Sequence, residues 1–270
     1  MADLLAIVDG RLMPVAEATV PAADPGFVRG DAVFEVVRIY DGRPFALDEH
    51  LARMVRSAAR MRLELDPVAV RAEIVALLAE TRSFSGVIRF IVTRGGRRIG
   101  MLEQPQDSDD PVALRTIVHA PTPLLAQIKS VSYAANMLGG RLAVEEGAED
   151  ALFVSPQGHV LEGPTFTIFM RFAGETDWLT PPLGEHVLDS ITRRAAFAVL
   201  GASAREQVVE AARLTELDEA FLASTVREAR PVGSIDGRAL PQAPGAATLE
   251  IRAALRAQIA ARCAAAEGPC

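Results

Sequence analysis

Residues 126–166, which decide the fold, read AQIKSVSYAANMLGGRLAVEEGAEDALFVSPQGHVLEGPTF. Residues 131–146 predict a helix that stops at Gly147. Residues 151–163 form two apolar runs about a Pro-Gln-Gly turn, a pattern typical of a β-hairpin. One lysine, Lys129, stands just before the predicted helix. The stretch therefore predicts a helix followed by paired strands, with an amine where the helix begins.

Lys129 is the only lysine in the chain, and all other cationic side chains are arginines. A buried lysine can lose its proton and form a Schiff base with an aldehyde, whereas arginine cannot lose its proton at a useful pH. Taken alone, one surface lysine left over in an arginine-rich chain explains the count better. The sequence around Lys129 has to decide between these two interpretations.

Strands and helices alternate through the rest of the chain. Apolar residues at helical spacing predict a helix from Asp48, and Pro67 opens a second helix through about Thr81. A further helix spans Ser190 to Leu200, with Ser190 or Thr192 near its N-terminus. The other predicted elements are strands at residues 4–10, 32–45, 87–96, 113–118, 165–172, 178–182 and 219–225, and a helix at 246–265.

A domain boundary is predicted near the middle of the chain. Residues 104–111 are polar and rich in turn residues, and the Pro-Thr-Pro unit at 121–123 resists regular structure. We therefore expect a small N-terminal α/β domain over residues 1–118, a linker over 119–128 and a larger C-terminal domain over 129–270.

Composition excludes several classes of function. The net charge is −7 and half of the residues are hydrophobic, which argues against nucleic acid or anionic membrane as a partner. No stretch approaches the length of a membrane span and the first residues lack a secretory pattern, so we expect a cytoplasmic protein. The four histidines suit no metal pair and the two cysteines lie near the C-terminus, so we expect no metal site.

Five blocks of sequence, in order, resemble the fold-type IV enzymes that depend on pyridoxal 5′-phosphate (PLP). This family includes D-amino-acid transaminases, branched-chain aminotransferases, (R)-amine transaminases and 4-amino-4-deoxychorismate lyases. The resemblance implies two α/β domains with PLP in the cleft between them, a Schiff base on Lys129 and a homodimer. The matching blocks are residues 26–58, 88–96, 126–166, 180–194 and 218–237.

The resemblance assigns a group of residues to the cofactor phosphate. A helix start supplies backbone N–H groups and a favourable dipole for such an anion. Arg53 supplies the fixed positive charge, and Ser224 stands where the family usually has glycine. The remaining phosphate contacts are Ser190, Ile191, Thr192 and Thr225.

Three further residues are assigned to the cofactor ring. A carboxylate from Glu162 keeps the pyridine nitrogen protonated, so that the ring can take up electrons from the substrate Cα. An exposed hairpin glutamate is the alternative interpretation of Glu162. Leu188 packs on one face of the ring, and Tyr133 either hydrogen-bonds the ring oxygen or is a packed aromatic.

The substrate-binding residues are expected to be Phe34 and several arginines. Arg29 and Arg89 are expected to hold the α-carboxylate, with Arg97 or Arg98 as mobile gate residues. For Arg97 and Arg98 a solvated basic loop is an equally good interpretation. The Arg-x-His pair of many D-specific enzymes is incomplete here, because residues 93–100 contain no histidine.

The predicted function is amino transfer between a D-amino acid, or also an (R)-amine, and a 2-keto acid such as pyruvate or 2-oxoglutarate. Lys129 acts as the base and the kinetics are ping-pong. The first alternative is a 4-amino-4-deoxychorismate lyase, which needs the same lysine. The second is a branched-chain L-amino-acid aminotransferase, although Val36 and Val87 stand where those enzymes typically carry glycine and tyrosine. A PLP-free binding protein would have lost Lys129 or Glu162.

Overall fold

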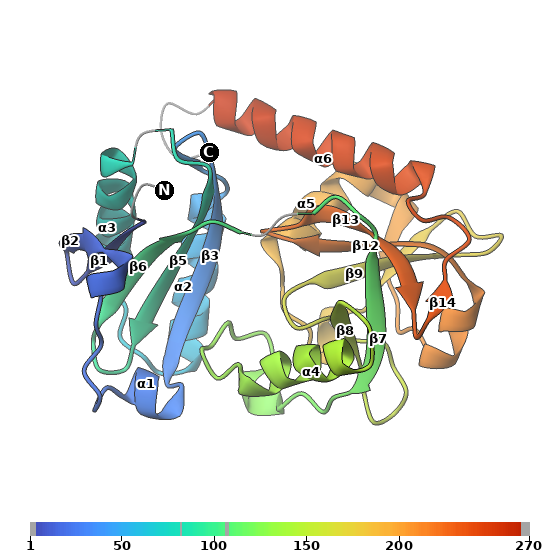
Figure 1. Cartoon of the computed structure of the whole chain (residues 1–270), viewed down its shortest axis with the longest axis horizontal. Coiled ribbons are helices and arrows are strands. Elements are labelled where there is room, and N and C mark those ends of the chain that lie inside the picture. The colour runs from blue at the N-terminus through green and yellow to red at the C-terminus, as the bar shows by residue number, and fades with distance from the viewer. Residues whose placement is uncertain (1–3, 82, 106–107, 266–270) are drawn as a thin grey trace. The chain divides into compact units, whose positions relative to one another are not determined.

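The computed structural model describes residues 4–81, 83–105 and 108–265, which divide into two compact units. Both units combine a β-sheet with helices, as the α/β prediction requires (Figure 1). Unit 1 comprises Met1–Gln106, Ile128–Tyr133 and Ile259–Cys270, and unit 2 comprises Asp107–Gln127 and Ala134–Gln258. The lysine segment thus belongs to unit 1, although the sequence placed it in the C-terminal domain.

Unit 1 contains a six-stranded antiparallel sheet with the strand order β2-β1-β6-β5-β3-β4. Its strands are β1 (Leu5–Val8), β2 (Arg11–Pro14), β3 (Ala32–Tyr40), β4 (Arg43–Pro44), β5 (Gly86–Thr93) and β6 (Arg98–Glu103). Its helices are α1 (Pro25–Arg29), α2 (Leu47–Arg60) and α3 (Pro67–Glu80). The predicted opening at Pro67 is confirmed, because Asp66 caps α3 by accepting hydrogen bonds from Val68 N and Ala69 N.

Strand β3 shows how the sheet of unit 1 acquires two different faces. Successive side chains point to opposite faces of a strand. Val33, Val37 and Ile39 enter the apolar core formed with α2 and α3. Phe34 and its alternate neighbours therefore lie on the opposite face, where Arg89 of β5 is the register partner of Val36.

Unit 2 contains an eight-stranded sheet in which seven strands follow the order β11-β10-β9-β12-β13-β7-β8, with β14 beside β13. Its strands are β7 (Val112–Val118), β8 (Asp150–Val154), β9 (Thr167–Phe172), β10 (Trp178–Thr180), β11 (Ala204–Glu206), β12 (Leu217–Ser224), β13 (Glu228–Ile235) and β14 (Arg238–Ala239). Its helices are α4 (Ala134–Glu145), α5 (Ile191–Leu200) and the greater part of α6 (Ala246–Ala265), whose last turns belong to unit 1. Short 3₁₀ helices occur at Val15–Glu17 in unit 1 and at Pro123–Leu125, Leu183–Glu185, Gly201–Ser203 and Ala211–Glu216 in unit 2.

The observed division of the chain lies at residue 106, whereas the sequence placed it at residue 118. The reason is the pairing of β7, which runs parallel to both β8 and β13 and so lies inside the sheet of unit 2. Strand β13 was not predicted, because Pro231 interrupts its apolar pattern and a proline usually argues against an inner strand. No helix in the described ranges is long and apolar enough to cross a membrane.

Candidate active site

Lys129 lies on an extended segment that runs beside β3 in unit 1. Phe34 N donates a hydrogen bond to Lys129 O at 3.0 Å, and Val131 N donates to Ala32 O at 2.9 Å. On the other side, Lys129 N donates to Ser57 Oγ of α2 at 3.2 Å. These bonds keep the segment extended, so α4 begins at Ala134 and not at the predicted residue 131. The backbone of the single lysine is thus fixed by both a strand and a helix.

The ring of Phe34 gathers three side chains that the sequence assigned to one site. Lys129 Nζ lies 4.3 Å from the ring centroid, and the guanidinium carbon of Arg89 lies 5.6 Å from it. Tyr133 packs edge-on against the same ring, with a centroid separation of 5.6 Å. A cation is attracted to the face of an aromatic ring, and two aromatic rings favour an edge-to-face contact. Lys129, Phe34, Arg89 and Tyr133 therefore come together in unit 1.

Arg53 belongs to a buried polar cluster that the sequence did not reveal. Glu35, His50 and Arg53 expose only 2%, 1% and 4% of their surfaces. Arg53 donates from Nε to Glu35 Oε1 at 2.7 Å and from Nη2 to Oε2 at 2.6 Å. His50 Nδ1 lies 2.8 Å from Glu35 Oε2. The three side chains form one hydrogen-bonded cluster between β3 and α2.

The charge state of this cluster follows from its surroundings. Burial alone would raise the pKa of Glu35, but the Arg53 guanidinium and the hydrogen bonds lower it to about 2. Burial lowers the pKa of His50, so that the imidazole is neutral at pH 7. An ionised carboxylate can only accept hydrogen bonds, which means that His50 Nδ1 carries the proton and donates to Glu35. The cluster therefore holds one anion, one cation and one neutral donor.

This pKa predicts how the stability of the protein changes with pH. The folded pKa of Glu35 lies below its ordinary value of 4.5, so its contribution is present above about pH 5 and is lost as the pH falls towards 2. At about 1.4 kcal/mol per pKa unit the difference corresponds to about 3 kcal/mol. Between pH 5 and pH 3 the free energy of unfolding should fall more steeply in the natural protein than in Glu35→Gln.

Urea unfolding followed by far-ultraviolet circular dichroism at pH 5, 4 and 3 measures this difference. Glu64→Gln is the matched control, because Glu64 is an exposed carboxylate of the same unit. The control should keep the slope of the natural protein. A Glu35→Gln variant with an unchanged slope would contradict the assigned charge of Glu35.

In unit 2, the structure brings Glu162 and Leu188 together. Phe153 N donates to Glu162 O at 2.9 Å, which fixes the backbone of the hairpin. Leu188 N then donates to Glu162 Oε1 at 3.0 Å and orients the carboxylate. A Cβ on Gly163 would lie 2.0 Å from the ring of Phe166, so a larger residue after Glu162 would force this buried ring to move. Glu162 is therefore held in place by its neighbours and is not a freely solvated hairpin residue.

The start of α5 has the geometry of an anion-binding helix N-terminus. Ser190 is the N-cap, as predicted, and its side chain accepts a hydrogen bond from Arg193 N at 3.3 Å. The first N–H groups of a helix have no acceptor within the helix. The amides of Ile191 and Thr192 are such groups, and the helix dipole makes them favourable donors to an anion.

The turn after β12 is held by contacts within unit 2. Ser224 ends the strand, and its Oγ accepts a hydrogen bond from Arg227 N at 3.0 Å. Arg227 Nη2 in turn donates to Asp150 Oδ2 of β8 at 2.7 Å. Thr225 follows Ser224 in this turn and is half-buried. The expected second phosphate contact thus lies in a turn that Arg227 anchors to β8, the strand at the edge of the sheet.

The arginines expected to bind substrate do not converge. Arg89 is engaged by Glu103 of β6, with bonds of 2.6 Å and 3.1 Å. Arg97 donates to Asp9 at 2.6 Å, and Arg98 donates to Glu73 of α3 at 2.9 Å. The Glu73 contact places Arg98 on the helix-covered face of the sheet. Of these three arginines, only Arg89 lies against Phe34.

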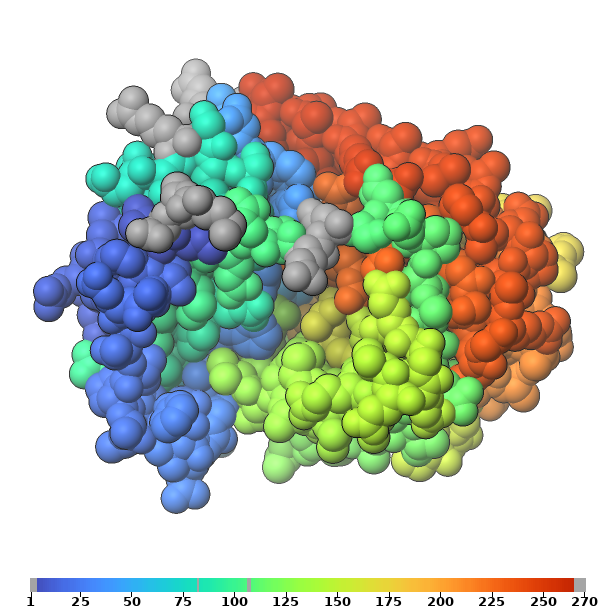
Figure 2. Space-filling view, viewed as in Figure 1, coloured from blue at the N-terminus to red at the C-terminus, as the bar shows by residue number. Residues whose placement is uncertain are grey.

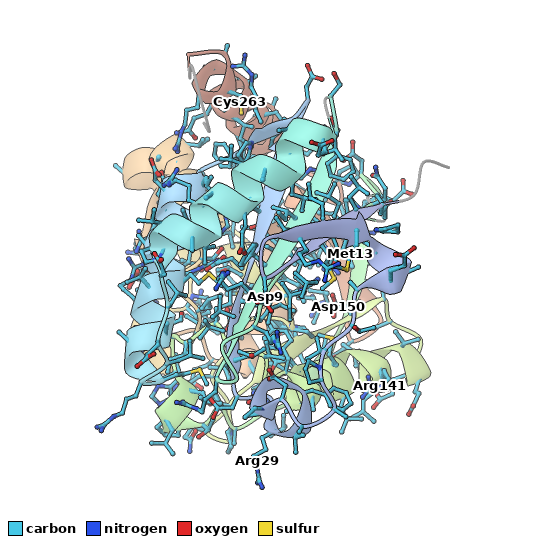
Figure 3. All side chains as sticks on the ribbon, turned by 90° about the vertical axis from the view of Figure 1, so that its left-hand side faces the viewer. Asp9, Met13, Arg29, Arg141, Asp150 and Cys263 are labelled. Carbon is cyan, nitrogen blue, oxygen red and sulfur yellow. The ribbon has the colours of Figure 1, made fainter. Side chains whose placement is uncertain are left out.

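Arg29 lies at the C-terminal end of α1, where its side chain is exposed and points away from the body of unit 1 (Figure 3). Gly30 follows in the left-handed conformation with φ 66°, and a Cβ there would lie 3.0 Å from Ser132 Oγ. Ser132 Oγ donates to Gly30 O at 3.0 Å. The residue after Arg29 is thus tied to the lysine segment through its backbone, whereas the Arg29 side chain is exposed.

Three residues that contact the predicted site residues were missed by sequence reasoning: Glu35, His50 and Ser57. A signal for Glu35 was present, because it occupies a core-facing position of β3 between Val33 and Val37. His50 and Ser57 flank Arg53 at helical spacing on the buried face of α2. Among the residues the structure describes, no group of three or more His, Cys, Asp or Glu side chains could hold a metal ion.

Comparisons with known proteins agree on the family. The family model named Amino-transferase class IV matches residues 32–235. A bifunctional aminodeoxychorismate lyase / D-amino acid transaminase of Mycobacterium tuberculosis is 31% identical, with 89% of this chain and 94% of the relative covered. A D-alanine aminotransferase of Bacillus licheniformis is 29% identical, covering 93% and 95%.

Solved structures show the same fold. A hypothetical aminotransferase of Mycobacterium tuberculosis in its PLP-bound form gives a TM-score of 0.86 at 27% identity, covering 96% of this chain and 99% of that one. A branched-chain aminotransferase of Thermoproteus uzoniensis gives 0.87 at 24% identity, covering 97% and 96%. The structure of the chain is similar to both.

Proposed function

Since this chain belongs to the class IV aminotransferases, whose cofactor is PLP, we propose that it transfers an amino group between a D-amino acid and a 2-keto acid. Pyruvate and 2-oxoglutarate are the proposed acceptors. The observation that carries the proposal is the position of the only lysine, whose backbone is fixed by β3 and α2 and whose Nζ lies 4.3 Å from the centre of the Phe34 ring.

The residues present fit PLP in their chemistry. Lys129 offers the amine, and Glu162 offers a carboxylate oriented by Leu188 N for the pyridine nitrogen. For the phosphate, α5 offers the amides of Ile191 and Thr192 at a capped helix N-terminus. The other proposed cofactor residues are Arg53, Tyr133, Leu188, Ser190, Ser224 and Thr225.

Lys129 is the proposed catalytic residue. When bound, PLP withdraws electrons from the substrate and makes its Cα–H acidic. Neutral Lys129 Nζ then removes the proton from the substrate Cα, and in the second half-reaction it returns a proton to the Cα of the new amino acid. The first keto acid leaves before the second one binds, and the amino group stays with the holoenzyme in between, so the kinetics are ping-pong.

The choice of a D-amino acid is supported by the strands near Phe34. Val36 and Val87 stand where branched-chain enzymes typically carry glycine and tyrosine, and the relative from Bacillus licheniformis is named a D-alanine aminotransferase. We propose Arg89 as a carboxylate ligand that leaves Glu103 when substrate binds. Arg29 is the second proposed ligand, and Arg97 or Arg98 would act as a gate.

Lyase activity is a second candidate function. The relative from Mycobacterium tuberculosis is named for both activities, and its match covers 89% of this chain. Release of pyruvate from aminodeoxychorismate requires the same amine, so Lys129 would serve both reactions. A branched-chain L-amino-acid aminotransferase is the third candidate.

The proposed assembly is a cytoplasmic homodimer in which Arg29 of one protomer completes the site of its partner. The exposed side chain of Arg29 suits such a role. Helix α4 also presents apolar side chains to solvent, and it lies on the surface of unit 2 in Figure 2. Its exposed apolar residues are Met137, Leu138, Leu142 and Val144.

Absorbance spectra of the purified protein with PLP test the proposed function. D-alanine is expected to convert the visible band of the bound cofactor to the shorter-wavelength pyridoxamine form, while L-leucine leaves the band unchanged. Conversion by L-leucine alone would replace the proposal with the branched-chain enzyme. A band unchanged by either amino acid, together with pyruvate release from aminodeoxychorismate, would replace it with the lyase.

A further inference from the structure

The buried cluster of Glu35, His50 and Arg53 is not explained by stability alone. Removing an ion pair from water costs free energy that the mutual attraction repays only in good geometry, and a well-packed apolar replacement is often as stable. Here the geometry is good, because two parallel bonds of 2.7 Å and 2.6 Å join Arg53 to Glu35. Such a clamp fixes the plane of the guanidinium as well as its charge.

His50 orients Glu35, the carboxylate to which Arg53 is bonded. Its Nδ1 donates to Glu35 Oε2, the same oxygen that accepts from Arg53 Nη2. Because His50 is neutral, it orients the Glu35 carboxylate without placing a second positive charge beside Arg53. These hydrogen bonds link His50 on one turn of α2, through Glu35 of β3, to Arg53 on the next turn of α2.

The same face of α2 leads to the lysine. Ser57 lies one turn beyond Arg53, and its Oγ accepts the hydrogen bond from Lys129 N. The helix face that carries Arg53 thus also positions the backbone of Lys129. An error in the placement of α2 against β3 would move both the proposed phosphate cation and the amine.

We propose that Glu35 and His50 are positioning residues that hold the Arg53 guanidinium in one orientation for the phosphate of PLP. The inference rests on the proposed function and goes beyond it, since it assigns a role to two side chains that touch neither cofactor nor substrate. It predicts that their loss weakens recognition of the phosphate more than recognition of the rest of the cofactor.

Binding of PLP and of pyridoxal, which lacks the phosphate, separates these two contributions. The apo-protein is titrated with each compound, and the dissociation constants are measured by absorbance. Glu35→Gln is expected to bind PLP about 10- to 100-fold more weakly, because a charged hydrogen-bond pair is lost, while pyridoxal binding changes less than about twofold. The ³¹P chemical shift of bound PLP should move in the same variant.

A pair of variants at His50 supplies the matched control. Asn keeps an N–H donor near the position of Nδ1, whereas Leu has none. His50→Asn should therefore bind PLP nearly as the natural protein does, and His50→Leu should lose affinity in the direction of Glu35→Gln. Arg53→Gln, which removes the guanidinium itself, should show the largest loss of PLP affinity.

Three results would overturn the inference. Glu35→Gln could bind PLP as tightly as the natural protein, or His50→Asn and His50→Leu could be equal. The third contrary result is that Glu35→Gln loses as much affinity for pyridoxal as for PLP, which would indicate a purely structural role. If the natural protein binds neither compound, the proposed function fails as well, and that outcome is distinguishable from the other three.

Discussion

Replacing Lys129 with alanine should remove the visible band of the imine between PLP and lysine and reduce amino transfer from D-alanine by at least about 10²–10⁴-fold, the usual contribution of a positioned base. The chain has no second lysine to take over. Stopped-flow or steady-state assays of pyruvate formation, with 2-oxoglutarate as acceptor, measure the rate. Circular dichroism checks that the variant is folded.

Lys129→Arg is the matched control for charge. Arginine keeps the cation near Phe34 but does not lose its proton at neutral pH, so this variant should be as inactive as Lys129→Ala. Small primary amines added to Lys129→Ala should restore part of the rate, because they can act as the missing base in the space left by the side chain. Full activity in either variant would contradict the assignment of Lys129.

Replacing Arg53 with methionine should lower the free energy of unfolding by about 3–5 kcal/mol, because Glu35 is left buried without its cation. The loss should be smaller at acidic pH. Burial alone raises the pKa of a carboxyl group, so Glu35 would take up a proton more readily once Arg53 is gone. Urea unfolding followed by circular dichroism at pH 7 and pH 5 measures both effects.

Two further variants show whether the loss comes from the ion pair. Arg56→Met changes an exposed arginine of the same helix and should alter stability by less than about 0.5 kcal/mol. The double variant Glu35→Leu/Arg53→Met removes both charges and should recover most of the stability lost in Arg53→Met. A double variant as unstable as the single one would indicate a packing defect and not an unpaired charge.

Several elements of the fold could be predicted because their signals are local. Ser190 caps α5 through its own side chain, and Pro67 opens α3 after Asp66, so three or four residues are enough to define each start. The start of α4 could not be predicted this way. Ser130 and Val131 are extended because they pair with β3, a strand about 100 residues earlier in the chain.

In the candidate site, too, some residues could be predicted from local sequence, whereas their contacts depend on the fold. Lys129 and Glu162 could be proposed from their own segments, and the structure adds the neighbours that hold them, Ser57 and Leu188. The pairing of Arg89 with Glu103 depends on the register between β5 and β6, which the sequence does not determine. For the same reason the sequence assigned both Arg89, as a carboxylate ligand, and Arg98, as a gate, to the substrate site, although the fold separates Arg98 from Arg89.

The most direct test of the proposed role of Lys129 is to locate the cofactor on the chain. The protein with PLP is treated with borohydride, which fixes the cofactor covalently to the amine that carries it, and the digested peptides are analysed by mass spectrometry. The peptide that contains Lys129 should be modified in the natural protein and unmodified in Lys129→Arg. Modification of the N-terminal amine alone, or of no peptide, would show that Lys129 does not carry PLP.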